Sequence, residues 1–216
     1  MYIPEKFNQP DVQVMHKLIQ DYPLATLVTH TADGLNANHI PMHLSTEPVP
    51  YGVLRGHVAR ANPVWQTLTP GHEVLSIFNG PDAYITPAWY ATKQQTGKVV
   101  PTWNYAVVHA YGQLQVIEDT DWLRTHLSLM TAQNEAVFPQ QWQLSDAPED
   151  FIERLMGVII GIKIVITRLS GKWKVNQNQP PENQKSVIEG LKESDLRNAE
   201  PMRDLISSYI NSDAQS

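Results

Sequence analysis

A dense cluster of aromatic and polar residues lies at 100–105, just ahead of the apolar, β-type run at 106–112. A plain core strand would carry valine or isoleucine at such positions. Buried tryptophan and tyrosine need partners for their polar tips. The cluster suits a flat polar ligand, with rings to stack on its face and an amide to reach its edge. Alternatively, it is a well-packed strand entry whose polar tips are satisfied. The candidate residues are Thr102, Trp103, Asn104 and Tyr105.

A second candidate lies at 55–63, where basic residues flank the end of a predicted strand that runs into a helix start. Arginine and free amides at a helix N-terminus bind anions, and a glycine lets a ligand approach the backbone. The segment therefore predicts a phosphate site; the alternative is a solvated strand end with an Asn-Pro helix start. The candidate ligands are Arg55, Gly56, His57, Arg60 and Asn62. Neither a Walker loop nor a GxGxxG fingerprint is present.

Other catalytic chemistries find little support. His39 and His43 are four residues apart on a predicted strand, which places them about 13 Å apart along it and too far to share one metal. The remaining histidines are scattered without nearby acidic residues at a metal-motif spacing, so no metal site is expected. The chain has no cysteine and no Gly-x-Ser-x-Gly elbow, which argues against thiolate zinc sites, cysteine nucleophiles and serine hydrolases.

Composition and charge are those of an ordinary soluble globular protein. The formal net charge is -6 and the isoelectric point about 5.7, which argues against a broad nucleic-acid-binding face. The N-terminus lacks a signal-peptide pattern. The longest apolar run, at 156–166, is interrupted and shorter than the roughly 20 residues that span a bilayer. We expect a cytoplasmic protein without a membrane partner.

Hydrophobic periodicity and turn residues predict a β-rich chain with a few helices. The predicted strands cover 24–30, 35–44, 51–58, 73–78, 83–86, 106–118, 157–169 and 171–175, and the predicted helices cover 12–21, 62–68, 120–133, 148–155 and 180–191. The strand at 157–169 is rich in isoleucine and valine and is expected to be buried on both faces. Hairpin connections without a βαβ alternation favour an α+β protein, a mainly antiparallel β-barrel with α-helices, over a Rossmann sheet.

Five stretches, taken together and in order, carry a family resemblance: 1–4, 55–63, 80–90, 100–105 and 171–178. They resemble the PaiB family of FMN-binding negative transcriptional regulators. The resemblance implies an FMN-binding split barrel, similar to pyridoxamine-phosphate oxidases, that forms a homodimer with its cofactor at the subunit interface. We expect residues 1–195 to form this domain and 196–216 a C-terminal helix and a frayed tail.

The chemistry of FMN agrees with the two candidate segments. The basic segment offers ligands for the phosphate, and the aromatic segment offers contacts for the isoalloxazine ring. FMN is favoured over FAD or NAD because there is one phosphate cluster and no dinucleotide fingerprint. No acid–base pair stands out, so no catalytic residue is assigned.

Three functions remain open from the sequence. The first is a flavin-dependent oxidoreductase of a small molecule. The second is a PaiB-type flavin-containing regulator without turnover, although the acidic charge and the lack of a helix-turn-helix argue against direct DNA binding. The third is a haem-binding split barrel, although no histidine is singled out as an axial ligand.

Overall fold

The computed structural model describes residues 1–66 and 73–213, so residues 67–68 of the predicted helix at 62–68 lie outside the described part. The chain folds as two compact units. Unit 1 contains Met1–Asp11, Asn79–Val108 and the segment that begins at Ser170, and unit 2 contains Val12–Phe78 and His109–Leu169. The boundary expected at residue 196 stays a prediction.

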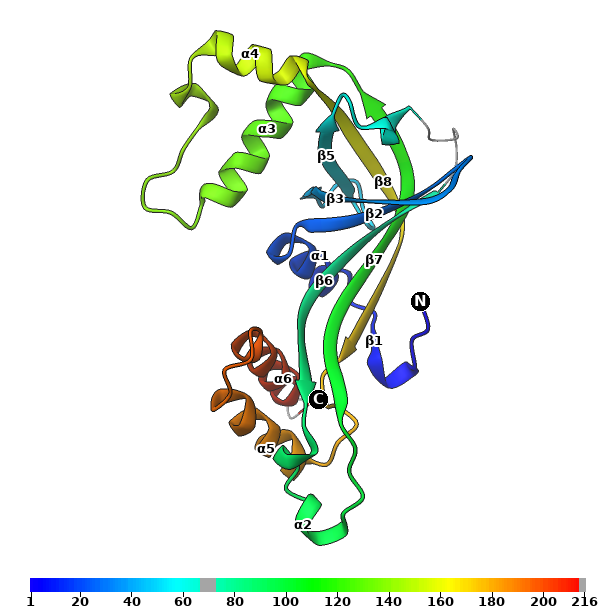
Figure 1. The fold of residues 1–216 in the computed structure, drawn as a ribbon, viewed down its shortest axis with the longest axis vertical. Coiled ribbons are helices and arrows are strands. Elements are labelled where there is room, and N and C mark those ends of the chain that lie inside the picture. Colours follow the sequence, from blue (N-terminus) through cyan, green and yellow to red (C-terminus); the bar gives the residue numbers. More distant parts are fainter. Residues whose placement is uncertain (67–72, 214–216) are drawn as a thin grey trace. The chain divides into compact units, whose positions relative to one another are not determined.

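The strands in the described part form one eight-stranded sheet in the order β3-β2-β6-β7-β8-β5-β4, with β1 added to β8 (Figure 1). Antiparallel pairing joins β2 to both β3 and β6, β5 to both β4 and β8, and β1 to β8. Their bounds are β1 Asn8–Gln9, β2 Leu24–Thr31, β3 Gly34–Pro41, β4 His43–Ser45, β5 Val53–Ala59, β6 Glu73–Ile85, β7 Thr102–Ile117 and β8 Ile159–Lys174.

The sheet in unit 2 must curl into a barrel, because its two end strands are almost continuous in sequence. β3 and β4 lie at opposite ends of the strand order, yet Met42 alone separates them. Met42 is buried, and a Cβ built on Gly56 of β5 would lie 2.7 Å from its Sδ atom. The ends of the sheet therefore meet around Met42. This confirms a mixed α+β fold with a large antiparallel sheet of split-barrel type and corrects the single strand expected at 35–44.

Helices accompany both units. Unit 2 carries α1 (Val12–Asp21), α3 (Thr120–Glu135) and α4 (Glu149–Gly157), and unit 1 carries α2 (Lys93–Thr96), α5 (Pro181–Lys192) and α6 (Ala199–Asp213). The bounds of α1 agree with the prediction. Asp119 caps α3, because its carboxylate accepts a hydrogen bond from the Trp122 backbone N–H at 2.7 Å. None of the helices within the described residues is both long and apolar enough to cross a membrane.

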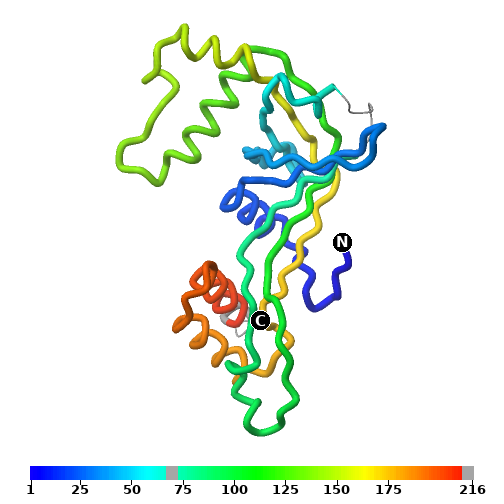
Figure 2. Tube along the Cα trace, viewed as in Figure 1, coloured from blue at the N-terminus to red at the C-terminus, as the bar shows by residue number. Residues whose placement is uncertain are grey.

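Three predicted strand boundaries were wrong. The predicted strands at 73–78 and 83–86 both fall in β6, those at 157–169 and 171–175 both fall in β8, which begins only at Ile159, and Thr102–Tyr105 lies inside β7 rather than ahead of it. The course of the chain through these segments can be followed by colour in Figure 2. In β6, Gly80 and Pro81 are both buried, so the in–out alternation shifts by one residue and disguises a continuous strand. β8 alternates over most of its length, so it is not buried on both faces.

Candidate functional site

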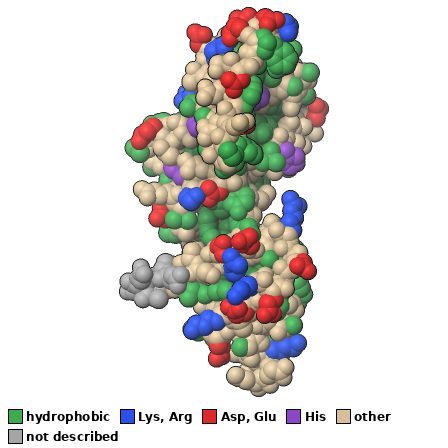
Figure 3. All heavy atoms as spheres, turned by 90° about the vertical axis from the view of Figure 1, so that its left-hand side faces the viewer, with side chains coloured by type: hydrophobic (Ala, Val, Ile, Leu, Met, Phe, Trp, Pro, Cys, Tyr) green, Lys and Arg blue, Asp and Glu red, His purple; other side chains and the backbone are tan. Residues whose placement is uncertain are grey.

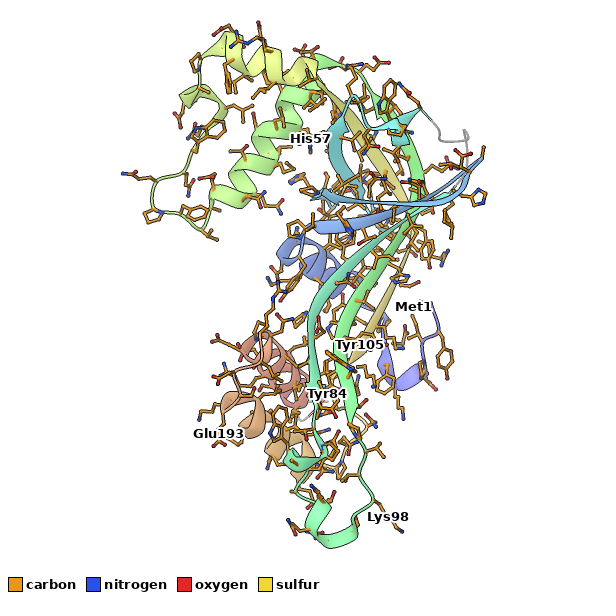
Figure 4. All side chains as sticks on the ribbon, in the orientation of Figure 1. Met1, His57, Tyr84, Lys98, Tyr105 and Glu193 are labelled. Carbon is orange, nitrogen blue, oxygen red and sulfur yellow. The ribbon has the colours of Figure 1, made fainter. Side chains whose placement is uncertain are left out.

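In unit 2, β5 and α3 bring a tryptophan and two histidines together. Arg55 and His57 alternate with buried residues of β5 and therefore point to one face of the strand. The side chains of Trp122 and His126 in α3 lie on this face. His57 Nδ1 lies 3.1 Å from His126 Nε2, and the Trp122 and His126 rings stack with centroids 5.3 Å apart. Figure 4 labels His57 on the ribbon.

A glycine makes room for this arrangement. Gly161 of β8 is the register partner of His57. A Cβ at Gly161 would lie 2.6 Å from Cζ3 of Trp122. The indole therefore packs on a position that has no side chain, directly beside His57.

The strands next to β5 add two more basic residues. His43 of β4 and Lys163 of β8 are both register partners of Arg55. Residues that lie opposite one another in a sheet point to the same face. We call His43, Arg55 and Lys163 the basic row.

The basic row has no acidic counterpart. Among the described residues, neither Arg55 nor Lys163 forms an ion pair with a carboxylate. The Nε atom of Arg55 is buried without a hydrogen-bond partner, and its guanidinium lies 5.9 Å from the Trp122 ring centre. Buried charges in proteins are ordinarily paired. A partly buried cation next to further basic residues favours an anionic ligand.

The histidine pair is neutral at physiological pH. Burial lowers the pKa of His126 to about 3, assisted by His57, His43 and Arg55. Burial also lowers the pKa of His57. In the neutral pair one ring nitrogen donates to the other, and His43 Nδ1 lies 2.7 Å from Gln133 Oε1, which accepts. Neutral imidazoles next to the basic row can donate hydrogen bonds to an anion without adding charge.

The other predicted phosphate ligands have partners within the protein. Arg60 lies at the surface, with Nη1 at 3.4 Å from a carboxylate oxygen of Glu118. Asn62 Oδ1 accepts from the Val64 backbone N–H at 3.0 Å and so caps a three-residue 3₁₀ helix, Pro63–Trp65. Asn62 therefore fits the alternative interpretation of this segment, in which Asn-Pro starts a helix. The space above Gly56 is filled by Met42, as described above, so this glycine serves packing within the protein.

In unit 1, the aromatic segment lies on β7 and its residues alternate between the two faces. Trp103 and Tyr105 share one face, with Trp103 55% exposed. The Tyr84 ring of β6 meets Trp103 edge-on at 5.9 Å, and Lys172 Nζ of β8 lies 5.3 Å from the Tyr105 ring centre. Tyr84 and Tyr105 are labelled in Figure 4. We call Tyr84, Trp103, Tyr105 and Lys172 the aromatic face.

Asn104 lies on the opposite side of the strand from the aromatic face. Its side chain is 1% exposed, and neither amide atom has a hydrogen-bond partner. The structure thus brings Trp103 and Tyr105 together and separates Asn104 from them. Lys174 donates hydrogen bonds to the Thr102 hydroxyl and, at 2.8 Å, to the Trp103 carbonyl, and burial lowers its pKa.

Several residues of the site were missed by sequence reasoning. His126 looked scattered, although it lies four residues after Trp122 on a predicted helix and so interrupts its apolar stripe. That interruption was the available signal. No sequence signal pointed to Lys163, because its pairing with Arg55 depends on the register of two strands that are distant in sequence.

Comparisons with known proteins agree with this architecture. The family described as "Putative FMN-binding domain" matches residues 1–168. The protease synthase and sporulation protein PAI 2 of Bacillus subtilis is 30% identical over 97% of this chain and 98% of its own length.

Solved structures show the same fold at low sequence identity. A conserved hypothetical protein of Mycobacterium tuberculosis aligns with a TM-score of 0.58 at 12% identity, covering 83% of this chain and 94% of the other. The FAD and haem binding protein of Mycobacterium smegmatis aligns with a TM-score of 0.56 at 14% identity, covering 85% of this chain and 80% of the other. The family match and the relationship to PAI 2 confirm the PaiB resemblance, and the chain belongs to the FMN-binding domain family.

Proposed function

We propose that this protein binds FMN, with the phosphate held at the basic row, and uses the flavin in a redox reaction on a small molecule. The observation that carries the proposal is the unpaired, partly buried guanidinium of Arg55 beside Lys163 and His43. A phosphate dianion would supply the missing negative charge, and Arg55 can bind it through two parallel hydrogen bonds. Arg60 lies just beyond the same strand and is proposed as a further phosphate contact.

We propose separately, for unit 1 by itself, that the aromatic face is a stacking surface for a flat ring system such as an isoalloxazine. Trp103 and Tyr105 offer exposed ring area for a flat π system. Lys172 lies over the Tyr105 ring and can place positive charge beside a flavin carbonyl. Bound FMN supplies the electron-transfer chemistry, while these side chains orient the ring and tune its potential.

We also propose that two copies of the chain associate through the aromatic face. On this face Trp103 and Tyr84 are 55% and 41% exposed, and Tyr2, which is 82% exposed, has its ring centre 5.9 Å from Lys172 Nζ. Contiguous exposed apolar side chains mark sites of association. Light scattering at micromolar concentration should give twice the chain mass. A monomer under these conditions would contradict the association.

The cofactor is tested by the visible spectrum of the purified protein and by titration of the apoprotein with FMN, FAD and haem. We expect flavin absorption bands in the blue and near ultraviolet, tight FMN binding and weaker FAD binding. An intense Soret band would establish the haem alternative instead. Absence of saturable FMN binding would refute the proposal.

Ring stacking is tested by Trp103→Ala, with Phe138→Ala as a matched control. Both aromatic side chains are exposed, at 55% and 54%, but Phe138 lies in unit 2 outside the basic row. Loss of stacking between a heterocyclic ring and an aromatic side chain costs about 1–3 kcal/mol. The FMN dissociation constant should therefore rise roughly 5- to 150-fold in Trp103→Ala and stay unchanged in Phe138→Ala. Equal affinities in the two variants would remove Trp103 from the site.

Redox turnover is tested by anaerobic stopped-flow reduction of the FMN-loaded protein with NADH and NADPH. We expect reduction of the bound flavin to outpace that of free FMN. Direct DNA binding is not expected, because each chain carries a net charge of -6 and phosphate neutralisation supplies most non-specific affinity. A nanomolar gel shift at physiological salt, competed by one DNA sequence only, would favour the regulator alternative.

A further inference from the structure

A cavity in unit 2 lies between α3 and α4 and has a different chemistry from the basic row. It has a volume of about 330 Å³. Its wall is formed by Leu127, Trp142, Ile152, Leu155 and Met156, and His57 is one of its few polar groups. Leu123, Ile152 and Met156 form a small hydrophobic core between the two helices, which gives the cavity a packed floor.

The cavity is uncharged. None of its described lining residues is Asp, Glu, Lys or Arg. An adjacent cavity, which shares Thr131, Trp142 and Leu144 with it, is also lined by the charged residues Arg124, Glu135 and Glu149. Transfer of a charged group into such an apolar wall is costly, so the first cavity favours a neutral ligand.

Apolar side chains around the mouth of the cavity are exposed to solvent. Trp142, Leu155 and Val158 are 44%, 48% and 59% exposed. Hydrophobic side chains appear at the surface of the upper part of Figure 3, where α3 and α4 lie. A ligand that seats here removes this apolar area from water.

His57 gives the cavity one directional hydrogen-bonding group. Its Nδ1 atom is already engaged by His126 Nε2 at 3.1 Å. The remaining ring nitrogen, Nε2, is therefore the one available to a ligand, and the contact to His126 holds the ring in place. Burial keeps His57 neutral at physiological pH, as described above.

We propose that this cavity binds an uncharged aromatic molecule of one or two fused rings that carries a single hydroxyl or equivalent polar group, bonded to His57 Nε2. The volume lies at the lower end of the roughly 300–1,000 Å³ range of small-molecule sites, which suits a ligand of that size. The proposal concerns a site separate from the aromatic face and does not require FMN to be bound.

The test is a fluorescence titration of the full-length protein with 2-naphthol, and with naphthalene as the analogue that lacks the hydroxyl. We expect one saturable 2-naphthol site per chain. A neutral hydrogen bond favours the hydroxyl compound by about fivefold. In His57→Phe this preference should disappear while naphthalene still binds.

A variant that narrows the mouth of the cavity tests where the ligand binds. Leu155→Trp enlarges an exposed residue at the mouth and should weaken 2-naphthol binding by about tenfold, equivalent to losing roughly 50 Å² of apolar burial at about 25 cal/mol per Å². Leu129→Trp is the matched control, because Leu129 is 40% exposed on α3 but does not line the cavity. FMN affinity, measured on the same two variants, should be unchanged, so a failure of either site is recognised separately.

Three outcomes would overturn the inference. The first is the absence of saturable 2-naphthol binding to the wild-type protein. The second is an equal effect of Leu155→Trp and Leu129→Trp. The third is 2-naphthol affinity that falls as protein concentration rises, which would show that a second copy of the chain covers the cavity.

Discussion

Replacing Arg55 by methionine should weaken FMN binding without destabilising the apoprotein. Methionine keeps the length and apolar stem of the side chain and removes its charge and its donors. Arg55 lies opposite Lys163 and His43 in register, and its buried Nε atom has no partner. Like charges directly opposite in a sheet cost roughly 0.2–1 kcal/mol, so the unfolding free energy of the apoprotein should rise by about that amount.

The loss of cofactor affinity is set by the bond to the phosphate. A hydrogen bond to a charged group contributes roughly 1.5–3 kcal/mol, which corresponds to an FMN dissociation constant about 10- to 150-fold higher in Arg55→Met. Arg60 is exposed and already lies 3.4 Å from Glu118. Exposed ion pairs contribute about 0–1 kcal/mol, so Arg60→Met should raise the dissociation constant by about fivefold at most.

The assay is quenching of FMN fluorescence on titration with apoprotein, combined with urea unfolding of the same samples. Arg154→Met serves as the control, because Arg154 is exposed on α4 and pairs with Asp150 four residues earlier. Unchanged FMN affinity in a normally folded Arg55→Met protein would refute the assignment of the phosphate to the basic row. An equal loss in Arg154→Met would show that the effect is one of overall charge.

Three further variants test the packing and protonation of the two units. In the unfolded chain His126 becomes protonated below about pH 6.5, whereas in the folded protein its pKa is about 3 and it stays neutral. Stability should therefore fall with decreasing pH, and by pH 5 the wild type should lose about 2 kcal/mol relative to His126→Phe, measured by urea unfolding. Gly161→Ala should cost about 1–3 kcal/mol, because its Cβ would collide with Trp122, whereas Gly157→Ala, which faces open space, should be near neutral in the same thermal melts. Asn104→Leu should raise the melting temperature of the apoprotein, because it replaces a buried amide without partners; a marked decrease would show that the amide is satisfied in solution.

The sequence by itself determined the local elements and the residue types that point to a flavin. Hydrophobic periodicity was enough to locate the helix at Val12–Asp21 and the start of α3 at Thr120. Hairpin signals and the lack of βαβ alternation were enough to predict an antiparallel barrel. These features depend on interactions between residues that are close in sequence, so they can be read without a structure.

Tertiary structure decided which of those residues meet. Closure of the barrel divides the chain at Met42 and sends β3 and β4 to opposite ends of the strand order. The register of β5 with β4 and β8 aligns Arg55 with His43 and Lys163. The alternation of β7 turns Asn104 away from Trp103 and Tyr105, although the three residues are consecutive. Strand register depends on packing between distant segments, and a shift of one residue reverses every side chain, so no local pattern contains this information.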